Sequence, residues 1–283
     1  MNDNTIAVIG AGTMGNGIAQ LAASAGLKVH MIDVNASALD AGMTAINRAL
    51  ERAVSRDKLS ADDAAATQAR LQPATSLEGI GECSLIIEAA SENPEVKRSI
   101  FRQLHEAAHP DAILASNTSS ISLTDIAAHS GRPDKVIGMH FFNPAPVMAL
   151  VEVIRALQTS DETFTRTRDL ALQLGKTPVE VKDSPGFIVN RMLVPMINEA
   201  VFVLAEGVAS AQDIDAAMKL GSNQPMGPLA LADLIGLDIC LSVMEVLYAE
   251  FADSKYRPCP LLKQMVAAGY LGRKSGRGFH HYA

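Results

Sequence analysis

A histidine begins the run HFFNPAPVMALVEV, from His140 to Val153, and a lone carboxylate, Glu152, nearly ends it. Glu152 has only apolar neighbours within two residues, and an ionised carboxylate is costly to bury unless a partner holds it. His140 is such a partner. A carboxylate that fixes the tautomer of an imidazole and stabilises its protonated form makes a general base for an alcohol proton. The same two residues could equally form a structural ion pair, so the run alone leaves both readings open.

A glycine-rich turn near the start of the chain is the second candidate for chemistry. Residues 5–9 are apolar and β-rich, and Gly10, Gly12 and Gly15 follow in the pattern G-x-G-x-x-G, before a helix expected over 14–24. Gly10 would make the tight turn, Gly12 would let the backbone approach a pyrophosphate, and Gly15 would let the helix pack on the sheet. The helix N-terminus would then face the phosphates.

An acidic residue completes this pattern. A second strand, expected over 28–32, ends in Asp33, about 20 residues after the glycines, where an acid binds the adenine-ribose hydroxyls. Val34 and Asn35 follow, and neither can take a 2′-phosphate, so the sequence favours NAD over NADP. A bare glycine pattern is weak evidence. The strand, glycines, helix, second strand and terminal acid together predict a dinucleotide site.

Composition limits the possible partners. The chain has 283 residues, 48% hydrophobic and 19% charged, enough for one large or two medium domains, and its net charge of −7 argues against nucleic acid. Three cysteines without metal spacing are expected to be reduced thiols. Because the first expected strand begins by Thr5, and no apolar stretch is long enough to span a bilayer, we expect a cytoplasmic enzyme that uses neither a signal peptide nor a membrane.

The elements needed to position these residues alternate along the first two thirds of the chain. Further strands are expected over 83–89, 112–116, 135–140, 148–154 and 178–182, with helices over 94–108 and 161–174. Such alternation predicts a mostly parallel sheet with helices on both faces. The polar segment 35–70 is long for one crossover and is expected to form a helical hairpin that projects from the sheet.

The pattern changes after the turn DSPG at 183–186, beyond which only helical periodicity is found, over 187–206, 211–220, 228–251 and 260–268. We therefore predict an α/β fold with two domains. Residues 1–184 form a Rossmann-like, mostly parallel sheet domain with the hairpin insertion, and residues 185–283 form an all-α domain that binds substrate and forms a homodimer.

Three further features each have two readings. The run SNTSS, Ser116 to Ser120, follows a strand at the edge of the sheet where ligands bind. The alternative is a cap for the next helix, which serine and threonine favour when the run is taken alone. Arg48, Arg52 and Arg56 recur every fourth residue, so they should lie along one side of a helix. They suit a ligand with several phosphates, or they form an ordinary solvated face.

The run HEAAH, His105 to His109, matches a zinc-protease pattern. The spacing of its helix predicts that the histidines point away from a buried face, among arginines that disfavour a divalent metal; that face would consist of Val96, Ile100, Leu104 and Ala108. We therefore expect a surface helix end and no metal site.

Taken in order, these segments resemble the NAD-dependent L-3-hydroxyacyl-CoA dehydrogenase family, and within it the short, stand-alone 3-hydroxybutyryl-CoA dehydrogenases. The resemblance covers essentially the whole chain. It rests on the motifs GAGTMGNGIAQ, IIEAASEN, SNTSS, GMHFFNPAPVMALVEV, DSPGFIVNR, QPMGPLALADLIGLD and GRKSGRGF.

The resemblance implies roles for individual residues. His140 is the general base, Glu152 orients it, and Ser119 and Asn190 contact the reacting part of the substrate. The hairpin meets coenzyme A, which makes Arg52 and Arg56 plausible phosphate contacts. The implied NAD contacts are Gly10, Gly12, Thr13, Met14, Gly15, Asp33, Glu92, Lys97, Ser119, Asn143 and Lys274.

The implied reaction interconverts (S)-3-hydroxybutyryl-CoA and acetoacetyl-CoA by hydride transfer with NAD, in a cleft between the domains that closes over the substrate. Two rivals stay open: a dehydrogenase of the same plan for a sugar acid or a simple 3-hydroxy acid, and a non-catalytic NAD-binding protein. Acyl-chain length, direction, pathway and the strictness of NAD over NADP are not given by the sequence.

Overall fold

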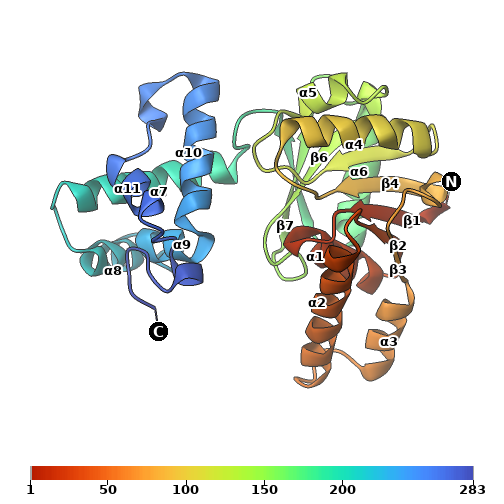
Figure 1. Ribbon diagram of the computed structural model, residues 1–283, viewed down its shortest axis with the longest axis horizontal. Helices are drawn as coiled ribbons and strands as arrows, with labels where there is room; N and C mark the ends of the chain where they lie inside the picture. Colours follow the sequence, from red (N-terminus) through yellow and green to blue (C-terminus); the bar gives the residue numbers. More distant parts are fainter. Residues whose placement is uncertain (1, 283) are drawn as a thin grey trace. The chain divides into compact units, whose positions relative to one another are not determined.

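The computed structural model describes residues 2–282, apart from the side chain of residue 3. The chain divides into two units, Met1–Asp183 and Ser184–Ala283. The first unit contains a sheet with helices, and the second unit is helical (Figure 1). Each unit is described by itself.

The first unit is built on an eight-stranded sheet in the order β3-β2-β1-β4-β5-β6-β7-β8. All neighbouring strands are parallel except β6 and β7, which are antiparallel. The strands are β1 (Asn2–Ile9), β2 (Lys28–Ile32), β3 (Leu71–Ala74), β4 (Cys83–Glu88), β5 (Ile113–Ser116), β6 (Val136–Phe141), β7 (Leu150–Arg155) and β8 (Thr177–Lys182). The predicted fold class, a mostly parallel Rossmann-like sheet, is confirmed.

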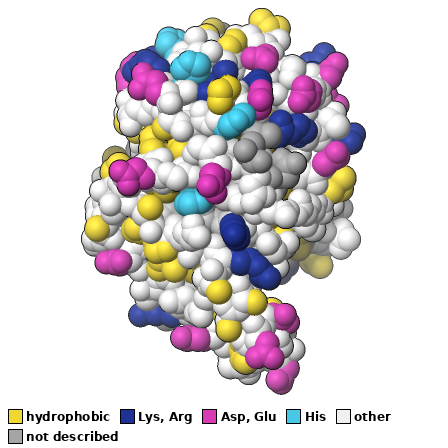
Figure 2. Space-filling model, turned by 90° about the vertical axis from the view of Figure 1, so that its right-hand side faces the viewer, with side chains coloured by type: hydrophobic (Ala, Val, Ile, Leu, Met, Phe, Trp, Pro, Cys, Tyr) yellow, Lys and Arg dark blue, Asp and Glu magenta, His cyan; other side chains and the backbone are white. Residues whose placement is uncertain are grey.

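Helices connect these strands. They are α1 (Thr13–Ser24), α2 (Ala36–Val54), α3 (Ala61–Ala69), α4 (Pro94–Ala107), α5 (Leu123–Ala128) and α6 (Asp161–Gln173). Asn35 and Ser60 accept hydrogen bonds from the first-turn amides of α2 and α3, which fixes where each helix begins. These two helices form the expected hairpin, which extends away from the sheet in Figure 1. Acidic side chains gather toward its free end in Figure 2, and the exposed acids of the segment 51–63 are Glu51, Asp57, Asp62 and Asp63.

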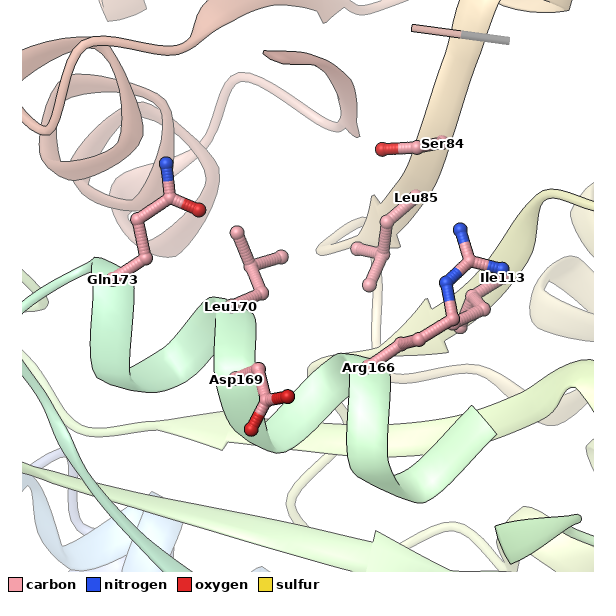
Figure 3. A pocket seen from close by; sticks show the side chains of 7 residues that line it. All are labelled: Ser84, Leu85, Ile113, Arg166, Asp169, Leu170 and Gln173. Atoms are coloured by element: carbon pink, nitrogen blue, oxygen red, sulfur yellow. The ribbon is translucent and has the colours of Figure 1, made fainter. Parts of the chain in front are cut away.

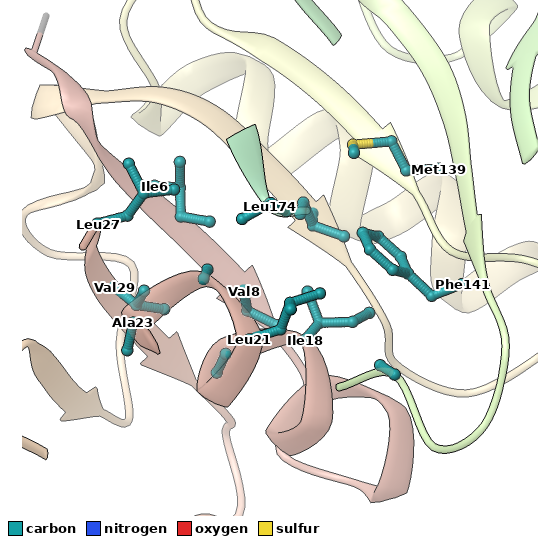
Figure 4. Close-up of a cluster of buried hydrophobic side chains, with 14 of the residues drawn as sticks. Ile6, Val8, Ile18, Leu21, Ala23, Leu27, Val29, Met139, Phe141 and Leu174 are labelled. Carbon is teal, nitrogen blue, oxygen red and sulfur yellow. The ribbon is translucent and has the colours of Figure 1, made fainter. Parts of the chain in front are cut away.

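Each face of the sheet is buried under helices. Alternate residues such as Ile6 and Val8 of β1 and Met139 and Phe141 of β6 join the core formed with α1 and α6, shown in Figure 4. Their neighbours in each strand point to the other face, where Gly138 of β6 approaches a side chain of α5. His140 therefore lies on the α5 face of the sheet.

The second unit consists of α7 (Val189–Ala205), α8 (Ala211–Gly221), α9 (Pro228–Ile235), α10 (Leu237–Phe251) and α11 (Pro260–Ala267). Its core includes Leu229, Cys240 and Leu247, all fully buried. The single helix expected over 228–251 is wrong. Gly236 has a φ of +109° and separates α9 from α10, because helical backbone requires negative φ.

Two other expectations need correction. The edge strand β3 was not anticipated, because only Leu71 of its four residues is buried and Pro73 weakens the strand pattern. The helix α4 buries Lys97, Phe101 and Leu104, whereas Val96, expected inside, is 41% exposed. Among residues 2–282, no helix is long and apolar enough to cross a membrane.

Candidate active site

The glycine turn has the shape required to receive a phosphate. Gly10 has a φ of +101°, and a Cβ there would lie 2.7 Å from the carbonyl oxygen of Ala89. A Cβ on Gly15 would lie 1.8 Å from the carbonyl oxygen of Gly10, so both positions require glycine. A Cβ on Gly12 would meet nothing within 4 Å. The packing of the protein therefore does not explain Gly12, whereas the approach of a ligand does.

The first turn of α1 offers hydrogen-bond donors. Gly12 is its N-cap, and no side chain caps the amides that follow. Thr13, exposed, and Met14, half-buried, begin the helix at this point. Uncapped amides at a helix N-terminus bind anions, so this arrangement fits a pyrophosphate.

Asp33 lies beside the same turn. Its Oδ2 accepts a hydrogen bond from the amide of Ala11 at 2.9 Å, and its Oδ1 accepts one from the amide of Asn35 at 2.9 Å. The carboxylate at the end of β2 is thereby held against the glycine turn. This position fits recognition of a ribose diol next to the pyrophosphate.

His140 and Glu152 are in direct contact. The Nδ1 of His140 lies 2.7 Å from the Oε2 of Glu152, and the two residues are 6% and 0% exposed. The ring of Phe142 lies 4.6 Å from the imidazole, centroid to centroid. A carboxylate in contact with Nδ1 fixes the tautomer of the ring and favours its protonated form. The predicted pair is therefore present, and it is buried.

A second buried ion pair lies on the same face of the sheet. The Nζ of Lys97 is 2.7 Å from both carboxylate oxygens of Glu88, and the two residues are 1% and 0% exposed. Ser116 donates its hydroxyl to Glu88 at 2.7 Å, and the amide of Ala90 donates at 2.8 Å. Every oxygen of this buried carboxylate is thus hydrogen-bonded, as a buried charge requires.

Glu92 connects this pair to the SNTSS run. Its Oε2 is 3.5 Å from the Nζ of Lys97, and its Oε1 accepts hydrogen bonds from the hydroxyl of Thr118 and from the amides and hydroxyls of Ser119 and Ser120. Burial alone would raise the pKa of Glu92, but the charge of Lys97 and these hydrogen bonds bring it below its usual range. Glu92 is therefore an anion that shapes the loop holding Ser119.

The SNTSS loop also reaches the histidine strand. The Oδ1 of Asn117 accepts a hydrogen bond at 2.9 Å from the amide of Phe141, the residue after His140. The alternative reading, that this run caps the next helix, is wrong, because Ser122 caps α5. The structure therefore brings Ser119, Glu92, Lys97 and the His140 strand into one network at the carboxyl ends of β4, β5 and β6.

The remaining candidate residues lie on other segments of the chain. Asn143 is exposed in the loop between β6 and β7. In the second unit, Asn190 is half-buried in the first turn of α7, and the Nζ of Lys274 lies 2.6 and 2.7 Å from the two carboxylate oxygens of Asp238. Burial would raise the pKa of Asp238, but Lys274 and nearby amides lower it.

The arginine stripe is shorter than expected. Arg48 and Arg52 lie on α2, but α2 ends at Val54, so Arg56 belongs to the turn that follows. All three arginines are exposed, and no carboxylate of the described residues lies within 4 Å of their nitrogens. Their charges are therefore open to solvent.

The HEAAH segment accepts hydrogen bonds from Arg132. The Nε of Arg132 lies 3.2 Å from the Nδ1 of His105, and its guanidinium also donates to the backbone oxygens of His105 and His109. Among residues 2–282, no group of three or more histidine, cysteine or carboxylate side chains could hold a metal.

A hollow also lies at the opposite edge of the sheet, where the strands begin. Arg166, Asp169 and Gln173 of α6 face Ser84 and Leu85 near the start of β4 and Ile113 at the start of β5 (Figure 3). The candidate site, in contrast, lies where β4 and β5 end. In open α/β sheets, ligands bind at the carboxyl ends of the strands.

Glu88 is a residue of the candidate site that was not predicted from the sequence. The available signal was a carboxylate in an apolar segment, the same signal that drew attention to Glu152. Because the apolar run predicts a strand that continues to 89, it places Glu88 inside a buried strand rather than at the end of one.

Comparison with known proteins places this arrangement in a family. Residues 5–184 match the model of the 3-hydroxyacyl-CoA dehydrogenase NAD binding domain, and residues 186–282 match that of the 3-hydroxyacyl-CoA dehydrogenase C-terminal domain. A 3-hydroxybutyryl-CoA dehydrogenase of Bradyrhizobium diazoefficiens is 52% identical over 98% of this chain and 94% of its own length. A probable 3-hydroxybutyryl-CoA dehydrogenase of Bacillus subtilis is 53% identical over 100% of this chain and 98% of its own length.

Solved structures agree. The crystal structure of (S)-3-hydroxybutyryl-CoA dehydrogenase from Ralstonia eutropha is 54% identical, covers 100% of both chains and has a TM-score of 0.97. The glycine turn, the acid after β2 and both family models thus point to the same class of enzyme. The chain belongs to the 3-hydroxyacyl-CoA dehydrogenase family and is an NAD-dependent dehydrogenase.

Proposed function

We propose that this enzyme interconverts (S)-3-hydroxybutyryl-CoA and acetoacetyl-CoA. The observation that carries the proposal is the buried contact between His140 and Glu152, with Nδ1 and Oε2 2.7 Å apart. It supplies a proton acceptor for a secondary alcohol, and relatives at more than half identity are named for this reaction.

His140 is the general base. Its Nε2 removes the proton of the 3-hydroxyl group during oxidation and returns it during reduction. Glu152 holds the ring by Nδ1 and stabilises the imidazolium that forms, so it is a positioning residue. NAD, when bound, accepts or returns the hydride of C3. Because an imidazole and its carboxylate serve both directions equally, the pair imposes no preferred direction.

Ser119 and Asn190 contact the reacting part of the substrate. Ser119 is supported by its place in the Glu92 network, which fixes its backbone and turns its hydroxyl proton toward Glu92. A serine hydroxyl that donates in this way keeps lone pairs with which to accept from a ligand. Asn190 is supported by the family resemblance and by its place in the first turn of α7.

The cofactor contacts follow from the fit of the glycine turn. Gly10, Gly12, Thr13, Met14 and Gly15 hold the pyrophosphate, and Asp33 binds the adenine ribose. The resemblance extends the contacts to Glu92, Ser119, Asn143 and Lys274. Lys97 does not contact the cofactor directly, because its ammonium is buried against Glu88. It acts on the cofactor through Glu92.

Coenzyme A is the group that the exposed arginines recognise. Arg52 and Arg56 have no carboxylate partner and lie at the end of the projecting hairpin, where charges suit phosphates. We expect Arg52 to contribute from the last turn of α2 and Arg56 from the turn after it.

Purified enzyme mixed with acetoacetyl-CoA and NADH should lower the absorbance of NADH. Straight-chain 3-oxoacyl-CoA thioesters of increasing length, each assayed with NADH and NADPH, would define the acyl pocket and the preference for NADH that Asp33 predicts. Well-folded protein that turns over none of these thioesters would contradict the proposal and favour a non-catalytic NAD-binding role.

The assembly is a homodimer formed by the second unit, acting in the cytoplasm. The dimer is supported by exposed apolar side chains of that unit, namely Met192, Val208, Leu220, Leu234, Ile239 and Tyr248. The cytoplasmic assignment is supported by three cysteines that are all free. Light scattering coupled to size-exclusion chromatography tests the dimer, and a monomeric mass would contradict it.

A further inference from the structure

Lys176 is a buried cation that the proposed mechanism does not use. It lies between α6 and β8, is 6% exposed, and its Nζ donates hydrogen bonds to the backbone oxygens of Ala145 at 2.7 Å and Met148 at 2.8 Å. Both oxygens belong to the segment 142–149, which joins β6 to β7 and is called the β6–β7 loop below.

The backbone oxygens of the β6–β7 loop stabilise the ammonium of Lys176. No carboxylate of the described residues lies within 4 Å of the ammonium. Burial lowers the pKa of Lys176, because leaving water costs the ammonium energy. A buried cation without a counter-ion is sustained by the oxygens that it touches, and here these come from one loop.

Other contacts hold the same loop around the lysine. The amides of Val147 and Met148 both donate to the oxygen of Pro144, and the amide of Thr177 donates to the oxygen of Ala149 at 2.8 Å. On the other side, a Cβ on Gly17 of α1 would lie 3.4 Å from the Cβ of Ala145. The loop is therefore fixed between α1, which begins at the glycine turn, and the start of β8.

Two parts of the candidate site depend on this loop. It connects the strand of His140 to the strand of Glu152, and it carries Asn143, which is exposed. An exposed side chain on a loop without regular structure has a defined place only if the backbone beneath it is held. Lys176 donates to the loop two residues after Asn143 and again five residues after it.

We propose that Lys176 is a positioning residue that clamps the β6–β7 loop and so presents Asn143 to the cofactor. This inference rests on the proposed function only in naming Asn143 as a cofactor contact. The clamp itself is a property of the chain and can be measured without turnover.

The experiment compares Lys176→Met, which keeps the length and apolar part of the side chain but has no donor, with Lys182→Met. Lys182 is an exposed lysine of the same strand, β8, and serves as the matched control. Amide hydrogen exchange at Val147 and Met148 reports the loop. NADH affinity, followed by the fluorescence of NADH itself, and the steady-state KM for NADH report the cofactor site.

In Lys176→Met we expect exchange at both amides to accelerate and the Kd and KM for NADH to rise by about tenfold or more, as loss of hydrogen bonds from a charged donor predicts. The kcat at saturating NADH should change much less, and Lys182→Met should match the unaltered enzyme. A role in stability alone would lower the melting temperature and leave the KM unchanged, which overturns the proposal.

If Lys176→Met does not fold, Lys176→Gln, which keeps neutral N–H donors, is judged by the same two readouts. Unaltered enzyme that binds NADH but does not reduce acetoacetyl-CoA would remove the proposed function. In that case exchange and NADH affinity still decide the role of Lys176: unchanged values in the variant overturn it, and faster exchange with weaker binding supports it.

Discussion

His140 and Glu152 are register partners across the antiparallel pair β6–β7. Directly opposed residues of antiparallel strands have Cβ atoms about 4.5–5.5 Å apart on the same face of the sheet. The contact between imidazole and carboxylate is therefore set by backbone register rather than by the chance meeting of two flexible side chains. A slip of one residue would turn Glu152 to the opposite face.

Replacing His140 with alanine should lower kcat by roughly 10²- to 10⁴-fold, the usual contribution of a general base. NADH should still bind, because the glycine turn and Asp33 are untouched. Steady-state assays with acetoacetyl-CoA, together with NADH fluorescence titration, check both parts. His129→Ala is the control, since His129 is an exposed histidine of the same unit. Near-normal turnover in the His140 variant would remove this residue from the mechanism.

Glu152→Gln removes the negative charge and keeps the shape of the side chain. The imidazolium that forms during turnover then loses its stabilising partner, so kcat should fall with little change in the KM for NADH. Glu180→Gln, an exposed carboxylate of β8, is the control. An unchanged kcat in Glu152→Gln would show that the buried pair is structural, which is the alternative left open by the sequence.

The His140–Glu152 pair and the glycine turn could be predicted from sequence because each has a local signature: a carboxylate in an apolar run, and glycines between a strand and a helix. The fold class followed from the alternation of elements. Glu88 has the same local signature as Glu152, but the apolar run around it predicts a strand that continues to 89 and so hides the carboxylate. Lys176 could not be predicted, because its partners, the backbone oxygens of Ala145 and Met148, come from a distant segment and depend on how the β6–β7 loop packs. Arg56 was misplaced because the fourfold spacing continues beyond the residue where α2 ends.

Breaking the buried pair of Glu88 and Lys97 should destabilise the protein strongly. Glu88→Gln leaves the ammonium of Lys97 buried without its main counter-ion, and such a change typically costs about 3–5 kcal/mol of unfolding free energy. Urea unfolding followed by circular dichroism measures this loss. The exposed Glu106→Gln of α4 should stay close to the unaltered protein.

The double variant Glu88→Leu/Lys97→Met separates stability from function. Replacing both charges with apolar groups should restore most of the lost stability, because neither side then carries an unpaired charge. The KM for NADH should nevertheless be higher than in the unaltered enzyme, since Glu92 has lost the ammonium 3.5 Å from its Oε2. If the double variant regains its stability and its KM for NADH equals that of the unaltered enzyme, Lys97 has no influence on the cofactor site through Glu92.

Arg52→Ala/Arg56→Ala should raise the KM for acetoacetyl-CoA and leave the KM for NADH unchanged. The expected effect is about tenfold, because each exposed contact to a phosphate contributes modestly in water. Arg102→Ala, an exposed arginine on α4, serves as the control for the loss of surface charge. Kinetics equal to those of the control would favour an enzyme of the same plan that acts on a substrate without coenzyme A.

Glu92 should make the protein sensitive to acid. Because the pKa of the folded carboxyl is below its ordinary value of 4.5, the ionised form contributes stability that is fully present above pH 4.5. That contribution is lost as the pH falls further, through the lower pKa of the folded state. The melting temperature of the unaltered protein should therefore exceed that of Glu92→Gln near neutral pH, and the gap should narrow below pH 4.5.

Parallel melts of Glu106→Gln separate this effect from general acid denaturation, which acts on every variant. A difference in melting temperature between the unaltered protein and Glu92→Gln that persists at the lowest pH would mean that the carboxylate does not need its charge to hold Thr118, Ser119 and Ser120.

This difference in melting temperature should narrow for a chemical reason. Protonation converts one acceptor oxygen of the carboxyl group into a donor and removes its attraction to Lys97, while the amides of Ser119 and Ser120 can only donate to Oε1. The loop that holds Ser119 should therefore loosen together with the loss of stability, and faster amide exchange at Ser119 and Ser120 over the same pH range would demonstrate it.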